Sequence, residues 1–212
     1  VTEEGIPLRK RRYVFSECFA AIAMSEYAIA SGDKSYATKA LEMFKRILKF
    51  LSTPGFLEPK YLPTLQSRGH SITMILINTA SRIREVIEDP VLDRQINESL
   101  TSIRQYFMHP EFKALLEMVG PKGELIDTCN GRTINPGHCI ETSWFIMEEA
   151  RHKNWDKDLV QLALQILDWS WEWGWDKEYG GIIKTSREFV EPIVLSTFVT
   201  AKIFHLKTIL KI

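Results

Sequence analysis

A histidine and a glutamate stand three positions apart at the end of a polar loop, as His138 and Glu141. Residues three apart share one face of an α-helix, so the imidazole and the carboxylate would project into the same space. The partial positive charge of a helix N-terminus favours a neutral imidazole, the form that can accept a proton. A nearby carboxylate can orient the ring. We therefore predict that His138 and Glu141 are catalytic residues of the general acid–base type.

The residues around this pair predict how it is positioned. Asn135-Pro136-Gly137 is a strong helix-start signal directly before His138. Trp144 continues the stripe of His138 and Glu141 and would add an aromatic wall. Asn135 and Trp144 are therefore candidate substrate contacts. The alternative is structural: His138 would bond to its own loop, and Trp144 would pack in a core.

Apolar residues at helical spacing predict an all-α chain made of successive helical hairpins. Gly32 is a good helix stop, and Asp33 a good N-cap for the next helix. A small hairpin is expected over 113–128, around Gly120 and Gly123. The expected helices cover about 13–30, 34–51, 70–88, 92–107, 137–152 and 156–173.

The composition indicates a folded chain without a dominant charge. With 212 residues and 45% hydrophobic composition it can bury one sizeable core, so we expect a single domain over 1–212. Lysine plus arginine equal aspartate plus glutamate at 27 each, so no net field favours nucleic acid or an anionic membrane. A neutral substrate such as a sugar is compatible with this balance.

Three cysteines, Cys18, Cys129 and Cys139, form no Cys-x-x-Cys pair and leave an odd count. This pattern argues against a secreted disulfide framework and favours a reducing, cytoplasmic setting. The first twelve residues lack the apolar core of a signal peptide, and charges interrupt every apolar run before membrane-spanning length. We expect no membrane partner. No metal-ligand spacing or glycine-rich phosphate loop is present either.

The stretch around His138 resembles the signature of the N-acylglucosamine 2-epimerase family, which includes the renin-binding proteins. The similarity runs from about Arg11 through Gly181. The matching residues are Gly131-Arg132-x-x-Asn135-Pro136-Gly137-His138-x-x-Glu141-x-x-Trp144, together with Arg12-Tyr13 to Ala20 and Trp173-Gly174-Trp175-Asp176 followed by Tyr179-Gly180-Gly181.

The resemblance implies an (α/α)6 barrel, of which this chain would form about three helical hairpins plus a tail. It also implies interconversion of N-acetylglucosamine and N-acetylmannosamine by proton abstraction and return at C2, with His138 as one of two catalytic histidines. Asn-Pro-Gly before the histidine favours this branch over cellobiose epimerases. No cofactor is required, although ATP acts on some members as an effector. The implied partner is a small amino sugar, and a homodimer is one way to cover the open faces.

Four further residues become substrate-binding candidates through the resemblance. In the family, the helix that begins near residue 13 contributes to the sugar-facing wall, which suggests Tyr13 and Glu17. Arg68 and His70 stand at another expected helix start. Arg68 could hold a sugar hydroxyl, and His70 could be a second acid–base group. The structural alternatives are a half-buried tyrosine, a capping carboxylate and a histidine with a structural role.

The chain also departs from the family pattern. Family chains are longer at both ends, and they supply an early arginine, a Lys-Leu-Trp-Trp segment and a later catalytic histidine. None of these is found here, so the sequence resembles the middle of an enzyme. The tail over 182–212 is predicted to diverge, through a changed reading frame or truncation. The competing hypotheses are an inactive half-barrel or binding module, and a related aldose or cellobiose epimerase.

Overall fold

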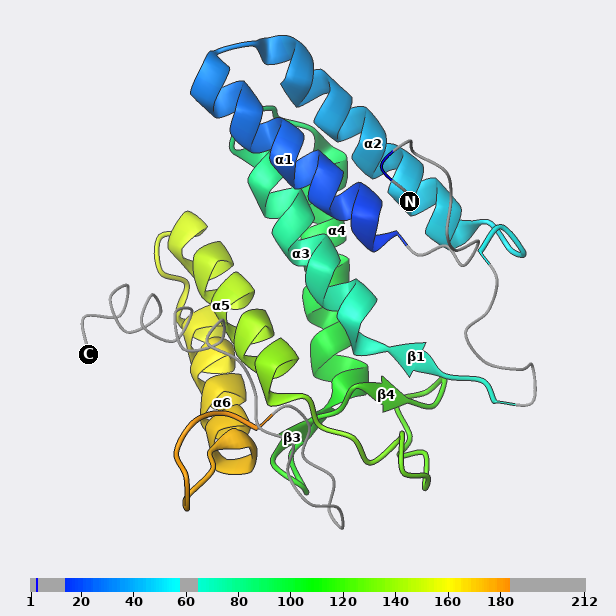
Figure 1. The fold of residues 1–212 in the computed structure, drawn as a ribbon, viewed down its shortest axis with the longest axis vertical. Coiled ribbons are helices and arrows are strands. Elements are labelled where there is room, and N and C mark those ends of the chain that lie inside the picture. The colour runs from blue at the N-terminus through cyan, green and yellow to red at the C-terminus, as the bar shows by residue number, and fades with distance from the viewer. Residues whose placement is uncertain (1–2, 4–13, 58–64, 184–212) are drawn as a thin grey trace. The chain divides into compact units, whose positions relative to one another are not determined.

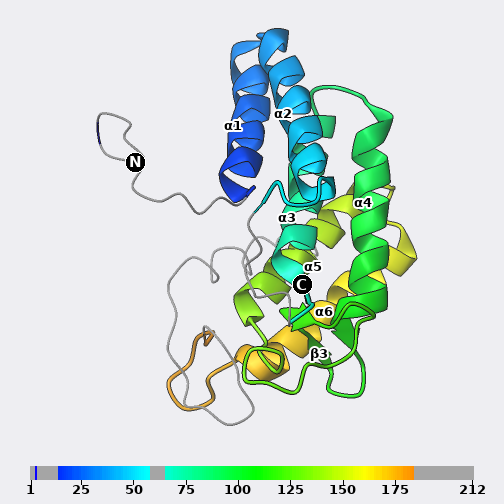
Figure 2. The same ribbon diagram turned by 90° about the vertical axis from the view of Figure 1, so that its right-hand side faces the viewer.

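The computed structural model describes residue 3 and the ranges 14–57 and 65–183. Within these ranges the chain is mainly helical, with four very short strands (Figures 1 and 2). The elements are α1 (Phe15–Ser31), α2 (Lys34–Ser52), β1 (Arg68–Gly69), α3 (His70–Arg84), α4 (Pro90–Ser102), the π-helical turn η1 (Ile103–Phe107), β2 (Met108–His109), β3 (Ala114–Leu115), β4 (Met118–Val119), α5 (Pro136–His152) and α6 (Lys157–Gly174).

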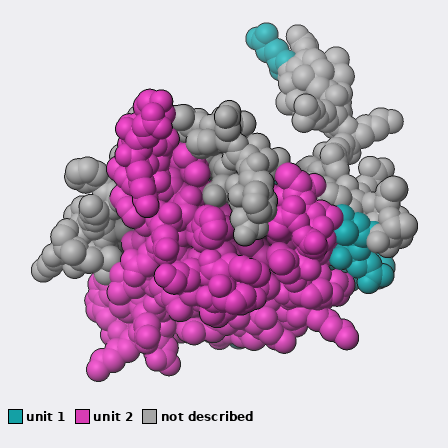
Figure 3. Space-filling model, turned by 90° about the horizontal axis from the view of Figure 1, so that it is seen from below, with its two compact units in different colours: residues 1–66, 78–96 teal, residues 67–77, 97–212 magenta. Residues whose placement is uncertain are grey.

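The chain divides into two compact units, which Figure 3 colours separately. Unit 1 comprises Val1–Gln66 and Asn78–Ile96, and unit 2 comprises Ser67–Ile77 and Asn97–Ile212. The N-terminal half of α3 therefore belongs to unit 2 and its C-terminal half to unit 1. The expectation of one partial barrel domain over 1–212 with a divergent tail from 182 stays a prediction, and the tail beyond residue 183 lies outside the described residues.

In unit 1, α1 and α2 pack side by side, and local capping signals set the turn between them. Gly32 ends α1 in the left-handed conformation at φ 72°, where a glycine has no steric penalty. The Asp33 carboxylate then accepts a hydrogen bond from the amide of Ser35 and caps α2. Both signals were predicted from the sequence. The buried face of α2 consists of Ala37, Ala40, Leu41, Phe44 and Ile47.

The turn between α3 and α4 differs in detail from the prediction. Helix α3 ends at Arg84, four residues before the expected Glu88. Helix α4 begins at Pro90, since proline suits the first helical position and Asp89 accepts a hydrogen bond from the amide of Val91. An ion pair between Arg84 and Asp93 links the two helix ends. The α-helix ends at Ser102, and the expected extension to Phe107 is a π-helical turn.

Unit 2 contains two short antiparallel strand pairs within its described residues. Strand β2 pairs with β3, and β4 pairs with β1 far back in the sequence, with Gly69 opposite Met118. The predicted hairpin over 113–128 is therefore wrong. Its turn exists, because the amide of Gly123 bonds to the carbonyl of Gly120, but residues 125 and 126 are not a strand. Pairing with the distant strand β1 is favoured because Met118 and Val119 form backbone hydrogen bonds there and are buried.

The second helical pair, α5 and α6, packs side by side and forms much of the core of unit 2. The Ser143 hydroxyl on α5 donates to the carbonyl of Ala163 on α6 at 2.7 Å. At Gly174, an added Cβ would lie 2.5 Å from Cβ of Pro136, so glycine permits the close approach of the two helices there. Fully buried core residues of this unit include Ile103, Phe107, Leu115, Ile140, Ile146, Met147 and Ile166.

None of the helices within the described ranges has the length and apolarity needed to span a membrane.

Candidate active site

The start of α5 presents His138 as the sequence predicts. Asn135 is the N-cap, and its side-chain oxygen accepts a hydrogen bond from the backbone amide of His138 at 3.3 Å. Pro136 occupies the first turn, where its missing N–H costs nothing. The role of Asn135 in the structure is thus to cap the helix. Its predicted contact with substrate stays a prediction.

The loop before α5 is tightly folded, which accounts for the glycine at its centre. A Cβ at Gly131 would lie 1.9 Å from the carbonyl oxygen of Ile126, so any other residue would force the backbone apart. The Gly131 amide bonds to the Thr128 hydroxyl, and the Arg132 guanidinium forms an ion pair with Asp127. These contacts fix the path by which the chain reaches Asn135.

A second acidic residue, Glu117, approaches His138 from the segment between β3 and β4. The Glu117 amide donates to the carbonyl of Thr133, and its carbonyl accepts from the amide of His70 at 3.0 Å. The backbone of Glu117 is therefore held on both sides, by the loop before α5 and by the start of α3. Its side chain is 18% exposed.

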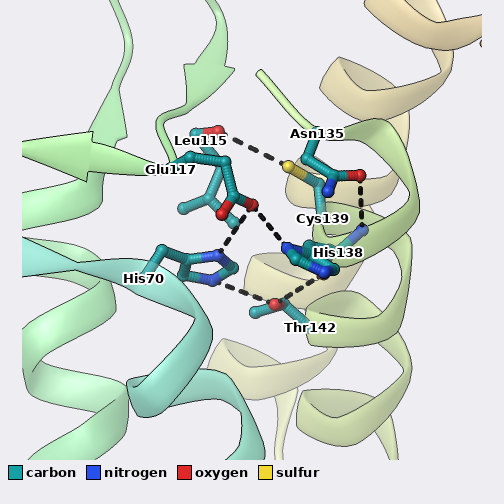
Figure 4. A network of polar contacts seen from close by, with 7 residues as sticks. All are labelled: His70, Leu115, Glu117, Asn135, His138, Cys139 and Thr142. Atoms are coloured by element: carbon teal, nitrogen blue, oxygen red, sulfur yellow. Dashed lines mark hydrogen bonds and ion pairs between the residues drawn. The ribbon is translucent and has the colours of Figure 1, made fainter. Parts of the chain in front are cut away.

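The carboxylate of Glu117 lies between two imidazoles (Figure 4). Its Oε1 atom is 2.8 Å from Nδ1 of His138, a hydrogen-bonding distance, and 3.6 Å from Nδ1 of His70, an ion-pair distance. His70 is fully buried and its ring packs edge-on against Phe107, whereas the His138 side chain is 37% exposed. All of these residues belong to unit 2.

The two histidines determine the ionisation of Glu117. Burial acts to raise the pKa of this carboxyl group, but the hydrogen bond with His138 and the charge interactions with His138 and His70 outweigh it and lower the pKa to about 2. Glu117 is therefore an anion at neutral pH. It can accept hydrogen bonds from imidazoles but cannot donate one.

Thr142 completes the network one turn along α5. Its hydroxyl lies 2.8 Å from the carbonyl oxygen of His138 and 3.0 Å from Nε2 of His70. Close by, the thiol of Cys139 is buried and contacts the carbonyl of Leu115 at 3.4 Å (Figure 4). Burial, the largest influence, raises the pKa of this thiol far above its usual range, which favours the protonated thiol over the nucleophilic thiolate.

The other predicted residues have different environments. Glu141 and Trp144 are both partly exposed on α5, and the Trp144 ring packs against Phe145 with centroids 5.1 Å apart. Arg68 is exposed; its Nε donates to the carbonyl of Pro121 at 2.6 Å, and its guanidinium lies over the Tyr106 ring. Glu17 is partly exposed in the first turn of α1, in unit 1, and Tyr13 lies outside the described residues.

Reasoning from the sequence missed Glu117 and Thr142. The carboxylate that the structure places on Nδ1 of His138 is that of Glu117. The catalytic role predicted for Glu141 stays a prediction. Thr142 could have been found, because it lies four residues after His138 and directly after Glu141 in the motif. Over ranges 14–57 and 65–183, no group of three potential ligands is arranged to hold a metal ion.

The chain joins a mainly helical fold to a histidine–carboxylate network at a helix start, and comparison with known proteins identifies its family. The model of the family N-acylglucosamine 2-epimerase (GlcNAc 2-epimerase) matches residues 1–202. The chain belongs to this family. The match continues past Gly181, where we expected the resemblance to end.

Curated relatives agree with this assignment. The N-acylglucosamine 2-epimerase of Rattus norvegicus is 28% identical over 186 residues, which are 86% of this chain and 44% of the relative. The human N-acylglucosamine 2-epimerase is 27% identical over 186 residues, again 86% of this chain and 43% of the relative. The chain thus spans less than half the length of the curated relatives it matches.

Solved structures show the same fold. The cellobiose 2-epimerase of Bacillus thermoamylovorans has a TM-score of 0.80 and 16% identity, covering 99% of this chain and 58% of that one. A sugar epimerase from a ruminal bacterium has a TM-score of 0.76 and 17% identity, covering 94% and 54%. These similarities confirm the predicted all-α fold of the (α/α)6-barrel type, represented here by about half of such a chain.

Proposed function

We propose that this chain carries the acid–base site of a sugar 2-epimerase, with His138 as the base that removes the proton at C2 and N-acetylglucosamine and N-acetylmannosamine as the sugars. The observation that carries the proposal is the partly exposed imidazole of His138 at the start of α5, where Asn135 caps the backbone amide and Glu117 contacts the ring. Membership of the N-acylglucosamine 2-epimerase family supports the choice of sugar.

The chemistry requires a proton to leave one face of the sugar carbon and to return to the other. After the ring opens, the C2–H bond breaks, its proton passes to the imidazole, and its electron pair forms the C1–C2 double bond of an enolate, whose negative charge lies on the former aldehyde oxygen. Reprotonation on the opposite face gives the epimer. Cationic or hydrogen-bonding groups must stabilise the oxyanion meanwhile, and Arg68, Glu141 and Trp144 remain the proposed substrate contacts within unit 2.

The full burial of His70 shapes what we propose for it. A ring with no exposed surface does not reach a sugar in this arrangement. We therefore propose that His70 acts on the reaction through Glu117 and Thr142, and not as the second acid–base group. An effector site for ATP, a homodimer and a cytoplasmic location also remain proposals, supported by the family resemblance and by the cysteine pattern.

Deuterium exchange at C2 tests the proposal directly. The purified chain is incubated with N-acetylmannosamine in deuterated water, and NMR follows deuterium entry at C2 and formation of the epimer. We expect exchange in the wild type and its loss in His138→Gln. Deuterium entry without epimer would mean that this chain supplies the base of one face only. A folded wild-type chain without any exchange would favour the alternative, an inactive half-barrel or binding module.

A panel of sugars separates this proposal from a related activity. Cellobiose and mannose are offered under the same conditions, because the structural neighbours include a cellobiose 2-epimerase and a D-mannose isomerase. Exchange with N-acetylmannosamine and not with the other two would support the proposed substrate. Preference for cellobiose or mannose would overturn the substrate while keeping the acid–base site.

A further inference from the structure

The proton on Thr142 determines which nitrogen of His70 is protonated. A threonine hydroxyl has one hydrogen, and here it is donated to the carbonyl oxygen of His138, 2.8 Å away. The contact at 3.0 Å between the same hydroxyl and His70 must then use the hydroxyl oxygen as acceptor. Nε2 of His70 is therefore the donor and carries a hydrogen, whereas Nδ1 of His70 has no hydrogen-bond partner among the described residues.

The same count of donors and acceptors at Glu117 places the hydrogen of His138 on the other ring nitrogen, Nδ1. An ionised carboxylate only accepts hydrogen bonds, so the 2.8 Å contact requires a hydrogen on Nδ1 of His138. In the neutral ring the lone pair is then on Nε2. Among the residues that the structure describes, none forms a hydrogen bond with this Nε2 atom, and the side chain is 37% exposed.

We infer that Glu117 is a positioning residue, which holds the proton of neutral His138 on Nδ1 and so leaves Nε2 as the only nitrogen able to accept a proton from a bound sugar. The catalytic meaning of this inference rests on the proposed function. The tautomer itself does not, because it follows from the contacts of the substrate-free chain.

The surroundings of Glu117 suit this role better than a purely stabilising one. Its backbone is fixed on both sides by Thr133 and His70, so the carboxylate has little freedom to follow another partner. Its Oε1 atom also faces His70, which Thr142 holds from the other side. Glu117 thus aims a rigid acceptor at one nitrogen of a ring whose other nitrogen is open, the arrangement by which carboxylates fix a catalytic imidazole.

Nitrogen NMR of the full chain tests the inference without substrate. The sequence holds five histidines, so the imidazole signals of a ¹⁵N-labelled chain are few, and His138→Gln identifies those of His138. We expect neutral His138 in the wild type to carry its hydrogen on Nδ1. We expect Glu117→Gln, which keeps the shape and removes the charge, to release the ring into a mixture of both tautomers.

A matched control exists in the same unit. His109 and Glu111 form a pair with a similar Nδ1–Oε1 distance of 2.9 Å, away from the site. Glu111→Gln should leave the His138 signals unchanged. Wild-type His138 with its hydrogen on Nε2 would overturn the inference, and so would an unchanged tautomer in folded Glu117→Gln. The wild-type measurement decides the first point even if the variant does not fold.

Exchange at C2 then separates the inference from the proposed function. If both hold, Glu117→Gln slows deuterium entry by at least about tenfold, while Glu111→Gln leaves it unchanged. Glu117→Gln could change the tautomer while neither the wild type nor any variant shows deuterium exchange at C2. In that case the positioning role is supported and the proposed function fails. Exchange at the wild-type rate in Glu117→Gln, despite a changed tautomer, would overturn the role of Glu117 in catalysis.

Discussion

Among its described residues, unit 2 contains two hydrogen-bonded histidine–glutamate pairs of almost equal length and opposite exposure. In the pair His138–Glu117, with 2.8 Å between Nδ1 and Oε1, the carboxylate is 18% exposed and the imidazole 37%. In the pair His109–Glu111, at 2.9 Å, the carboxylate is 58% exposed and the imidazole 10%. In the first pair the imidazole is more exposed than the carboxylate, and in the second pair the carboxylate is more exposed than the imidazole.

The difference shows that a histidine–carboxylate contact is not by itself a catalytic device. An imidazole can take a proton from a ligand only through a nitrogen that the ligand can reach. Nε2 of His109 is buried and has no hydrogen-bond partner among the described residues, and its ring stacks on Phe112. His109 is thus a packing residue at the end of a strand, and His138 is the candidate base.

The largest expected effect comes from replacing the imidazole of each pair in turn. His138→Gln should reduce deuterium entry at C2 of N-acetylmannosamine by about a thousandfold, because removal of an acid–base group commonly costs 10²–10⁴ in rate. His109→Gln should leave the rate unchanged in a folded chain. NMR measures both. Loss of exchange in folded His109→Gln together with exchange in His138→Gln would reverse the assignment of the two pairs.

The two carboxylates should differ next in how stability depends on pH. The pKa of Glu117 is lowered from 4.5 to about 2, so its contribution to the free energy of unfolding is present above pH 4.5 and is lost as pH falls through about 2. That shift corresponds to about 3 kcal/mol. Wild type should therefore exceed Glu117→Gln in stability by about this amount at pH 6, and the difference should vanish near pH 2.

Glu111 provides the control for this prediction. Its pKa is also lowered, first by its hydrogen bond with His109, but its carboxylate is exposed to solvent. Glu111→Gln should therefore change the pH dependence little. Urea unfolding followed by tryptophan fluorescence measures unit 2, because all six tryptophans lie at position 144 or later. Equal pH dependence in the two variants would contradict the burial argument.

The sequence predicts one half of the His138–Glu117 pair and not the other, for a physical reason. His138 follows a local helix-start signal, Asn135-Pro136-Gly137, and the structure confirms the helix that this signal predicts. Helix ends at Gly32 and Asp33 were predicted on the same kind of local evidence. Signals of this kind depend on residues within one helical turn, so contacts with distant parts of the chain do not change them.

Glu117 could not be placed in this way, because its position depends on pairing between distant segments. It lies 21 residues before His138, directly before a strand of two residues. Strands that short have no periodicity to detect, and the pairing of β4 with β1 replaced the local hairpin that the sequence suggested. The same pairing brings His70 to Glu117. The helices were predictable from their periodicity and His138 from its motif, whereas the contacts of Glu117 with the two histidines were predictable from neither.

The smallest expected effect concerns Thr142, which belongs to the network around His138 and Glu117 and has no counterpart among the described residues at the pair His109–Glu111. Thr142→Val removes the hydroxyl that accepts from Nε2 of His70, and it leaves a fully buried N–H without an acceptor. This should lower the free energy of unfolding of unit 2 by about 1–3 kcal/mol, the cost of a buried unsatisfied group. Thr142→Ser keeps the hydroxyl and should recover most of that loss, apart from a methyl group. If Thr142→Val were as stable as wild type in urea at pH 6, or if serine behaved like valine, the hydroxyl would not hold His70. The two histidine–glutamate pairs would then differ in exposure alone.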